Sequence, residues 1–89
     1  MKAILTVIGK DSVGIIAGIS ERLAALNVNI LDVSQTIMNG YFTMIMVLDL
    51  SAADKSFSDL KHALTEKGEA LHVTVMIQRE EIFTSMHSL

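Results

Sequence analysis

Apolar and polar positions alternate along this chain with two different periods, and the changes of period divide it into segments. Residues 2–9 are apolar on both faces of an extended strand, a pattern typical of a strand in the middle of a sheet. From Val13 to Asn27 the apolar positions recur at helical spacing. They are Ile16, Ile19, Leu23 and Leu26. The pattern therefore predicts a central strand followed by an amphipathic helix.

Two further strands flank Asn39-Gly40, a dipeptide favoured in type I′ hairpin turns because both central residues need a positive φ. Residues 29–38 alternate with a polar outer side, which is typical of an edge strand, whereas the strand from Tyr41 onward is apolar on both faces. Pairing outward from the turn sets four pairs opposite each other. They are Ile37 with Phe42, Gln35 with Met44, Val33 with Met46, and Leu31 with Leu48.

The second half of the chain predicts a helix, an edge strand and a final short helix. Ser56 with Asp59 three residues later has the spacing of a helix cap, and Gly68 is typical of a helix C-terminus. Residues 71–78 alternate with a mostly polar outer face. The segment from Arg79 carries apolar residues at helical spacing, namely Ile82, Phe83 and Met86.

The order strand, helix, strand, strand, helix, strand is the split βαβ pattern. We therefore expect an α+β, ferredoxin-like βαββαβ fold: a four-stranded antiparallel sheet in the order 4-1-3-2, with two helices on one face and a short C-terminal helix. The other sheet face is left to that last helix or to a second copy of the protein. Both main helices are expected to cover the face that carries Leu31, Val33, Phe42, Met44, Leu71 and Val73.

Length and composition restrict the function further. The 89 residues form a single expected domain, 1–89, and the absence of cysteine excludes disulfides and thiolate chemistry and fits a cytoplasmic location. No apolar run approaches the ~18 residues of a membrane helix, so no membrane partner is expected. A net charge of -3 argues against nucleic acid. With 51% hydrophobic and 19% charged residues, some surface is expected to meet another subunit.

The turn between the first strand and the first helix is the candidate binding site. Gly9 ends the strand, and Asp11 or Ser12 can accept a hydrogen bond from the first helical N–H groups. A helix N-terminus carries roughly half a positive charge and here lies beside Lys10, so the turn favours a carboxylate or a phosphate. Gly14 would leave room for a ligand. The simpler alternative is that these residues only cap the helix and turn the chain.

The chain resembles an ACT domain, a small ligand-sensing module of amino-acid metabolism, of the stand-alone type related to the glycine cleavage system transcriptional repressor. The resemblance covers essentially the whole chain and rests on residues 7–16 (VIGKDSVGII), Asn29-Ile30 and residues 32–36 (DVSQT). It implies an amino acid bound between paired subunits, near this turn, with Asn29 and Ile30 coming from the same or a neighbouring chain. The implied ligand-binding residues are Lys10, Asp11, Ser12, Val13, Gly14, Ile15, Asn29 and Ile30.

The same resemblance implies a regulatory module without a cofactor that assembles as a homo-oligomer, in the form of a dimer. Many family members carry a proline where this chain has Val13, so the first helical turn is less rigid here. No attached catalytic or DNA-binding domain is expected, so regulation would act through a regulated protein partner.

Other functions of domains with this topology fit the residues less well. Acylphosphatases need an arginine in the loop after the first strand, where this chain has Lys10 and no arginine, so no enzyme is expected. An RNA-binding module would need stacked aromatic residues, and only Tyr41 is suitably placed. No metal is expected at the three widely separated histidines, which are expected to be exposed: His62, His72 and His87. The remaining alternative is a dimeric protein-protein interaction module without a metabolite ligand.

Overall fold

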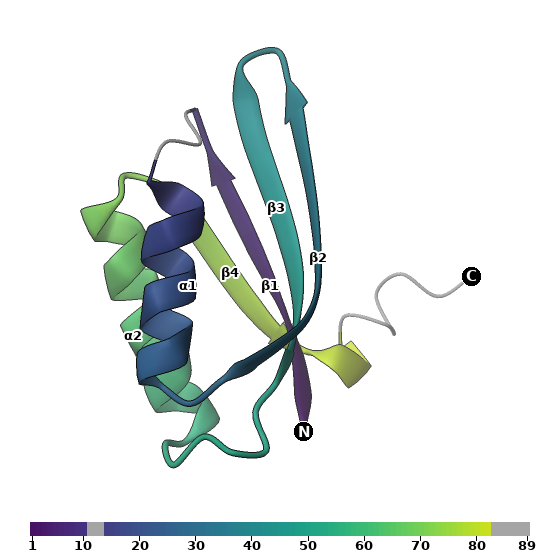
Figure 1. The fold of residues 1–89 in the computed structure, drawn as a ribbon, viewed down its shortest axis with the longest axis vertical. Helices are drawn as coiled ribbons and strands as arrows, with labels where there is room; N and C mark the ends of the chain where they lie inside the picture. Colours follow the sequence, from purple (N-terminus) through teal and green to yellow (C-terminus); the bar gives the residue numbers. More distant parts are fainter. Residues whose placement is uncertain (11–13, 83–89) are drawn as a thin grey trace.

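Four strands and two helices make up the computed structural model, which describes residues 1–10 and 14–82. The sheet is antiparallel with the order β2-β3-β1-β4, and both helices lie on one side of it (Figure 1). This arrangement confirms the predicted ferredoxin-like fold and the central positions of β1 and β3. The elements are β1 (Lys2–Gly9), α1 (Ile15–Ala25), β2 (Asn29–Met38), β3 (Tyr41–Asp49), α2 (Phe57–Ala70) and β4 (Thr74–Arg79).

The hydrophobic core lies between the helices and one face of β1, β3 and β4. Alternate residues of β1 and β3 point toward the helices, because successive side chains of a strand lie on opposite faces. Each helix contributes an apolar stripe to the same layer. The largest fully buried side chains are Leu5, Val7, Ile19, Leu23, Met44, Met46, Leu48, Leu60 and Leu64.

Strand β2 lies outside the cover of the helices. The expectation that both helices cover its apolar residues is wrong, because Leu31 is 45% exposed and Val33 is 44% exposed. The reason is that α1 and α2 pack against each other and α2 packs against β4, so the helical layer is centred away from β2 (Figure 1). An edge strand with apolar residues on its helix-facing side is therefore left open to solvent.

The hairpin register agrees with the prediction near the turn and departs from it farther away. Asn39 and Gly40 both have a positive φ, of 53° and 80°, as a type I′ turn requires. The predicted pairs of Ile37 with Phe42, Gln35 with Met44 and Val33 with Met46 are confirmed. The predicted pair of Leu31 with Leu48 is wrong, because an irregularity between Ile30 and Asp32 makes Ile30 the partner of Leu48. This bulge lets Ile30 pack against the core.

Helix α2 begins where the sequence predicts and ends later. The Ser56 hydroxyl oxygen accepts a hydrogen bond from the Asp59 backbone N–H at 3.1 Å, which confirms the predicted cap. Gly68 does not stop the helix, which continues to Ala70. Its role is close packing, because a Cβ atom on Gly68 would lie 2.5 Å from Val75 Cγ2. This glycine therefore lets α2 approach β4 closely.

The last strand is shorter than the alternation predicts. Leu71 and His72 form a turn, in which His72 has a φ of 59°, and β4 begins only at Thr74. At the other end of β4, the Arg79 guanidinium lies over the Phe57 ring, 5.2 Å from its centroid. A helical turn at residues 80–82 follows, and the rest of the predicted C-terminal helix, with Phe83 and Met86, lies outside the described residues.

Candidate functional site

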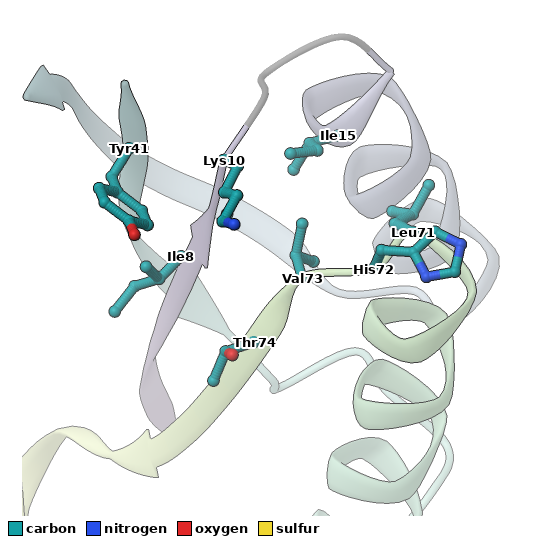
Figure 2. A pocket seen from close by; sticks show the side chains of 9 residues that line it. Ile8, Lys10, Ile15, Tyr41, Leu71, His72, Val73 and Thr74 are labelled. Carbon is teal, nitrogen blue, oxygen red and sulfur yellow. The ribbon is translucent and has the colours of Figure 1, made fainter. Parts of the chain in front are cut away.

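A hollow of about 550 Å³ opens at the end of β1, where β1, β4 and the start of α1 meet (Figure 2). It lies at the turn that the sequence singles out. Its walls come from the end of β1, from the start of α1, from the start of β3, and from the turn that leads into β4. The lining residues are Ile8, Gly9, Lys10, Ile15, Tyr41, Leu71, His72, Val73 and Thr74.

Two backbone features build this hollow. Gly9 allows β4 to begin close to β1, because a Cβ atom on Gly9 would lie 2.6 Å from Val73 Cγ1 and 3.3 Å from Ile15 Cδ1. His72 then turns the chain with its positive φ, so that only three residues connect the end of α2 to the start of β4. The antiparallel pairing of Ile8 with Thr74 fixes the edge of the hollow at which β1 and β4 lie side by side.

The lining is mostly apolar, with a few polar groups. Lys10 supplies an ammonium group, and its side chain lies between Tyr41 and Val73 (Figure 2). Hydroxyl groups come from Tyr41 and Thr74, and the exposed His72 lies on the far side. Among the described lining residues there is no carboxylate. Such a hollow suits a small ligand that has an anionic group and an apolar part.

The N-terminus of α1 differs from the expected one. The N-cap residue is Gly14, with a φ of 76° and no side-chain hydrogen bond. The residues expected to cap this helix, Asp11 and Ser12, lie outside the described residues. Among the described residues, and apart from the flanking residues and the backbone of α1 itself, no atom comes within 4 Å of the position that a Cβ atom on Gly14 would occupy. The first N–H groups of α1 therefore lack a side-chain acceptor within the described residues, beside open space.

The predicted ligand-binding residues fall into three groups. Lys10 and Ile15 line the hollow, and Gly14 lies next to it at the start of α1. Asn29 and Ile30 lie at the opposite end of the sheet, since Asn29 pairs with Asp49 of β3, which pairs with Lys2 of β1. That distance is about 24 Å along the strands. The remaining three predicted residues, Asp11, Ser12 and Val13, lie outside the described residues.

The sequence did not predict the lining residues that come from the start of β3 and from the segment that leads into β4. The predicted strand order already contained the signal, because an antiparallel neighbour of β1 must begin where β1 ends. That rule places residues 71–74 beside Gly9 without any reference to their chemistry. His62 and His72 are exposed, as expected.

A second hollow, of about 380 Å³, lies on the other flank of α1. It opens along the helix-facing side of the β2–β3 hairpin, where the helical layer ends. Its residues are Ile16, Gln35, Thr36, Ile37 and Phe42. We call it the hairpin groove. The turn after β1 thus has one hollow toward β4 and another toward the exposed edge of the sheet.

The described residues offer little to a metal ion or to a bilayer. Within residues 1–10 and 14–82, no three His, Asp or Glu side chains gather closely enough to hold a metal ion. None of the helices in this part of the chain has the length and apolar character needed to cross a membrane.

Comparison with known proteins gives a consistent result. A family model described as an ACT domain matches residues 2–78. A UPF0237 protein of Listeria innocua is 63% identical over 89 residues, which cover all of both chains. The solved structure of an ACT domain protein from Streptococcus pneumoniae superposes with a TM-score of 0.84 at 44% identity and covers 93% of each chain.

A more distant solved structure shares the fold. It is a proposed glycine cleavage system transcriptional repressor, with a TM-score of 0.76 at 20% identity. The match covers 88% of this chain and 44% of the other. At this identity the likeness concerns the fold alone.

Proposed function

This chain belongs to the ACT domain family, with UPF0237 proteins as full-length relatives, and on this premise we propose that it is a regulatory module that binds an amino acid in the hollow after β1. One observation carries the proposal. A cationic side chain, Lys10, lies in an otherwise largely apolar hollow whose described lining has no carboxylate.

An amino acid matches this arrangement group by group. Its carboxylate would contact the Lys10 ammonium and the N–H groups at the start of α1, which favour an anion. Its side chain would lie against the apolar wall of Ile15, Leu71 and Val73. Its ammonium group would face Asp11 or a backbone carbonyl of a strand.

The second part of the proposal is a homodimer formed by antiparallel pairing of two β2 edges. Nine of the ten residues of β2 are exposed, and Ile37 is 69% exposed. Native proteins protect such long apolar edges or pair them, because their free N–H and C=O groups accept another strand. This edge has no lysine or proline along its ten residues. We propose that a second copy covers it.

Antiparallel pairing would also bring Asn29 and Ile30 of the partner subunit to the end of the sheet at which the turn after β1 lies. It reverses the direction of the second β2, so the partner subunit's Asn29 and Ile30 would lie near the Met38 end of the first β2. That end borders the hairpin groove, to which α1 contributes Ile16. The partner subunit's Asn29 and Ile30 would then close the hairpin groove on one side of the turn after β1. The ligand would occupy the hollow on the other side of this turn.

Thermal unfolding in the presence of each common amino acid tests the ligand proposal. At a hundredfold excess over its dissociation constant, a ligand stabilises the folded state by ~2.7 kcal/mol. For a domain of this size, that is a rise in Tm of ~10 °C or more. Lys10→Met should strongly reduce the rise, whereas Lys55→Met, on the exposed connector before α2, should keep it.

Two results would contradict this proposal: no amino acid raises Tm, or Lys10→Met responds as fully as the parent chain. The exposed β2 edge favours one alternative, a dimeric protein-protein interaction module without a metabolite ligand. A dimer that responds to no amino acid would support that alternative.

A further inference from the structure

Three apolar side chains form the wall of the hollow on the helix side of β1. Ile15, Leu71 and Val73 gather on this side, whereas Ile8 and Tyr41 lie across β1 from them (Figure 2). Ile15 is 3% exposed and belongs to the core, and Leu71 and Val73 are half-buried and pack against the core. We call these three residues the inner wall. Its side chains have apolar neighbours behind them and the hollow in front.

The inner wall is held in place by the elements around it. The Val73 N–H donates a hydrogen bond to the Gly68 carbonyl oxygen at the end of α2, at 2.9 Å. A Cβ atom on Gly18 of α1 would lie 2.9 Å from Leu71 Cδ1, so this glycine makes room for the leucine side chain. Gly9 makes room for Val73 in the same way. The inner wall is therefore built without the ligand, as in most small-molecule sites.

The polar side chains of the hollow lie away from the inner wall. Alternation along β3, and the pairing of Ile8 with Thr74, place the Tyr41 and Thr74 side chains on the sheet face that points away from the helices. His72 is exposed, and its ring points away from Lys10 (Figure 2). Among the lysine, arginine, aspartate and glutamate residues of the described chain, only Lys10 lines the hollow.

We propose that the ligands are large apolar amino acids, such as leucine and methionine, and that the inner wall selects them; this inference rests on the proposed function. The ligand carboxylate would occupy Lys10, so a second carboxylate, as in aspartate, would find no further cation in the described lining. An amide or ammonium side chain would lie against an inner wall that offers it no partner. A polar group that loses water without gaining a partner weakens binding.

The size of the hollow favours a large side chain over a small one. Its volume of about 550 Å³ lies within the ~300–1,000 Å³ that is typical of small-molecule pockets. Burial of one CH₂ group tightens binding roughly fourfold. Leucine carries an isopropyl group where alanine has a hydrogen atom, which would give a factor of roughly fifty if the whole group were buried. Because the hollow opens to solvent, we expect a factor of about ten or more.

Isothermal titration calorimetry of the parent chain with amino acids of matched shape tests this selection. Asparagine and aspartate have the branched outline of leucine, with polar atoms in place of its methyl groups. Leucine should bind about tenfold more tightly, or better, than asparagine, aspartate or alanine. Equal affinity for leucine and any of these three would overturn the inference and leave the proposed function standing. Binding of none of the common amino acids would overturn both.

Two matched variants test the role of the inner wall. Val73→Thr replaces a methyl group of the wall with a hydroxyl at nearly constant size, so it should weaken leucine binding several-fold and reduce the preference for leucine over asparagine. Val75→Thr makes the same change on the same side of the sheet, outside the lining, where the side chain lies against Gly68 of α2. This control should keep the preference of the parent chain.

Circular dichroism checks that both variants fold, and the comparison of matched amino acids on the parent chain needs no variant. A folded Val73→Thr chain with an unchanged preference for leucine would overturn the role of the inner wall. So would an equal loss of preference in Val75→Thr, because the effect would then not depend on contact with the ligand.

Discussion

Substituting Gly9 with alanine tests the close approach of β1 and β4 that builds the hollow. In an ordinary strand position, Gly→Ala stabilises by ~0.5–1 kcal/mol, because glycine loses more backbone freedom on folding. Here the new Cβ would lie 2.6 Å from Val73 Cγ1, well inside contact distance. Overpacking of this kind typically costs ~1–3 kcal/mol. We therefore expect Gly9→Ala to destabilise the protein by ~0.5–2 kcal/mol.

The second member of a double-mutant cycle makes this prediction sharp. Val73→Ala removes Cγ1, while the Val73 Cβ lies at an acceptable 3.4 Å from the new methyl group. The close contact that remains in the Val73→Ala background is Ile15 Cδ1, the end of a flexible side chain, at 3.3 Å. In this background Gly9→Ala should therefore stabilise by up to ~0.5–1 kcal/mol, the ordinary value for a strand. The sign of the Gly9→Ala effect thus reverses between the two backgrounds.

Urea unfolding followed by circular dichroism measures all four chains of the cycle. The free energies should be compared at one protein concentration, since assembly adds to apparent stability, and with unchanged m-values. Equal effects of Gly9→Ala in both backgrounds would refute the reasoning, because the contact with Val73 would then not determine the cost.

Three further substitutions test other contacts. Ser56→Ala removes the acceptor for the Asp59 N–H and should lower the free energy of unfolding in urea by ~1 kcal/mol. Ser56→Asn should retain most of this stability, because asparagine can also cap a helix. The Ser51 hydroxyl donates to Asp49 at 2.6 Å and holds the pKa of that carboxyl below its ordinary value of 3.8. A lowered folded-state pKa adds stability that is fully present above the unfolded-state pKa and is lost as the pH falls through the folded-state pKa. Thermal unfolding should therefore show that Ser51→Ala is less stable than the parent chain at pH 7 and that the difference is lost as the pH falls through the lowered pKa of Asp49. Gly14→Ala should cost ~1 kcal/mol in urea, because only its φ of 76° opposes a side chain, and Gly14→Asn should cost less.

The fold could be predicted from the sequence because local and non-local signals agreed. Asn39-Gly40 specified a turn geometry, and the alternation on either side of it specified the same register. The register failed only beyond Val33, where a bulge gave Ile30 the core position predicted for Leu31. A bulge depends on which of two apolar neighbours packs better against distant residues, so local alternation cannot locate it.

The extent of the helical layer was harder to predict. The apolar residues of β2 satisfy the pattern of a strand with one buried face, yet the helices leave them exposed. Periodicity reports that a face is apolar and does not report what covers it. Similarly, Gly68 fits a helix stop in sequence, but its role is close packing against Val75, a residue of another element.

The position of the site could be predicted more fully than its composition. The turn after β1 was identified from Gly9 and Lys10, which do line the hollow. The opposite wall, from Leu71 to Thr74, carries no binding motif and is defined only by strand order.

The proposed pairing through β2 lies beside the turn after β1, and this would link ligand binding to assembly. Pairing through β2 would close the hairpin groove beside Ile16, while the hollow lies on the other side of the turn. A ligand that contacts two chains binds the assembled state more tightly, and assembly then tightens ligand binding by the same factor. A small domain with a single cation in its hollow could in this way convert the concentration of an amino acid into a change of oligomeric state, without any large movement within the chain.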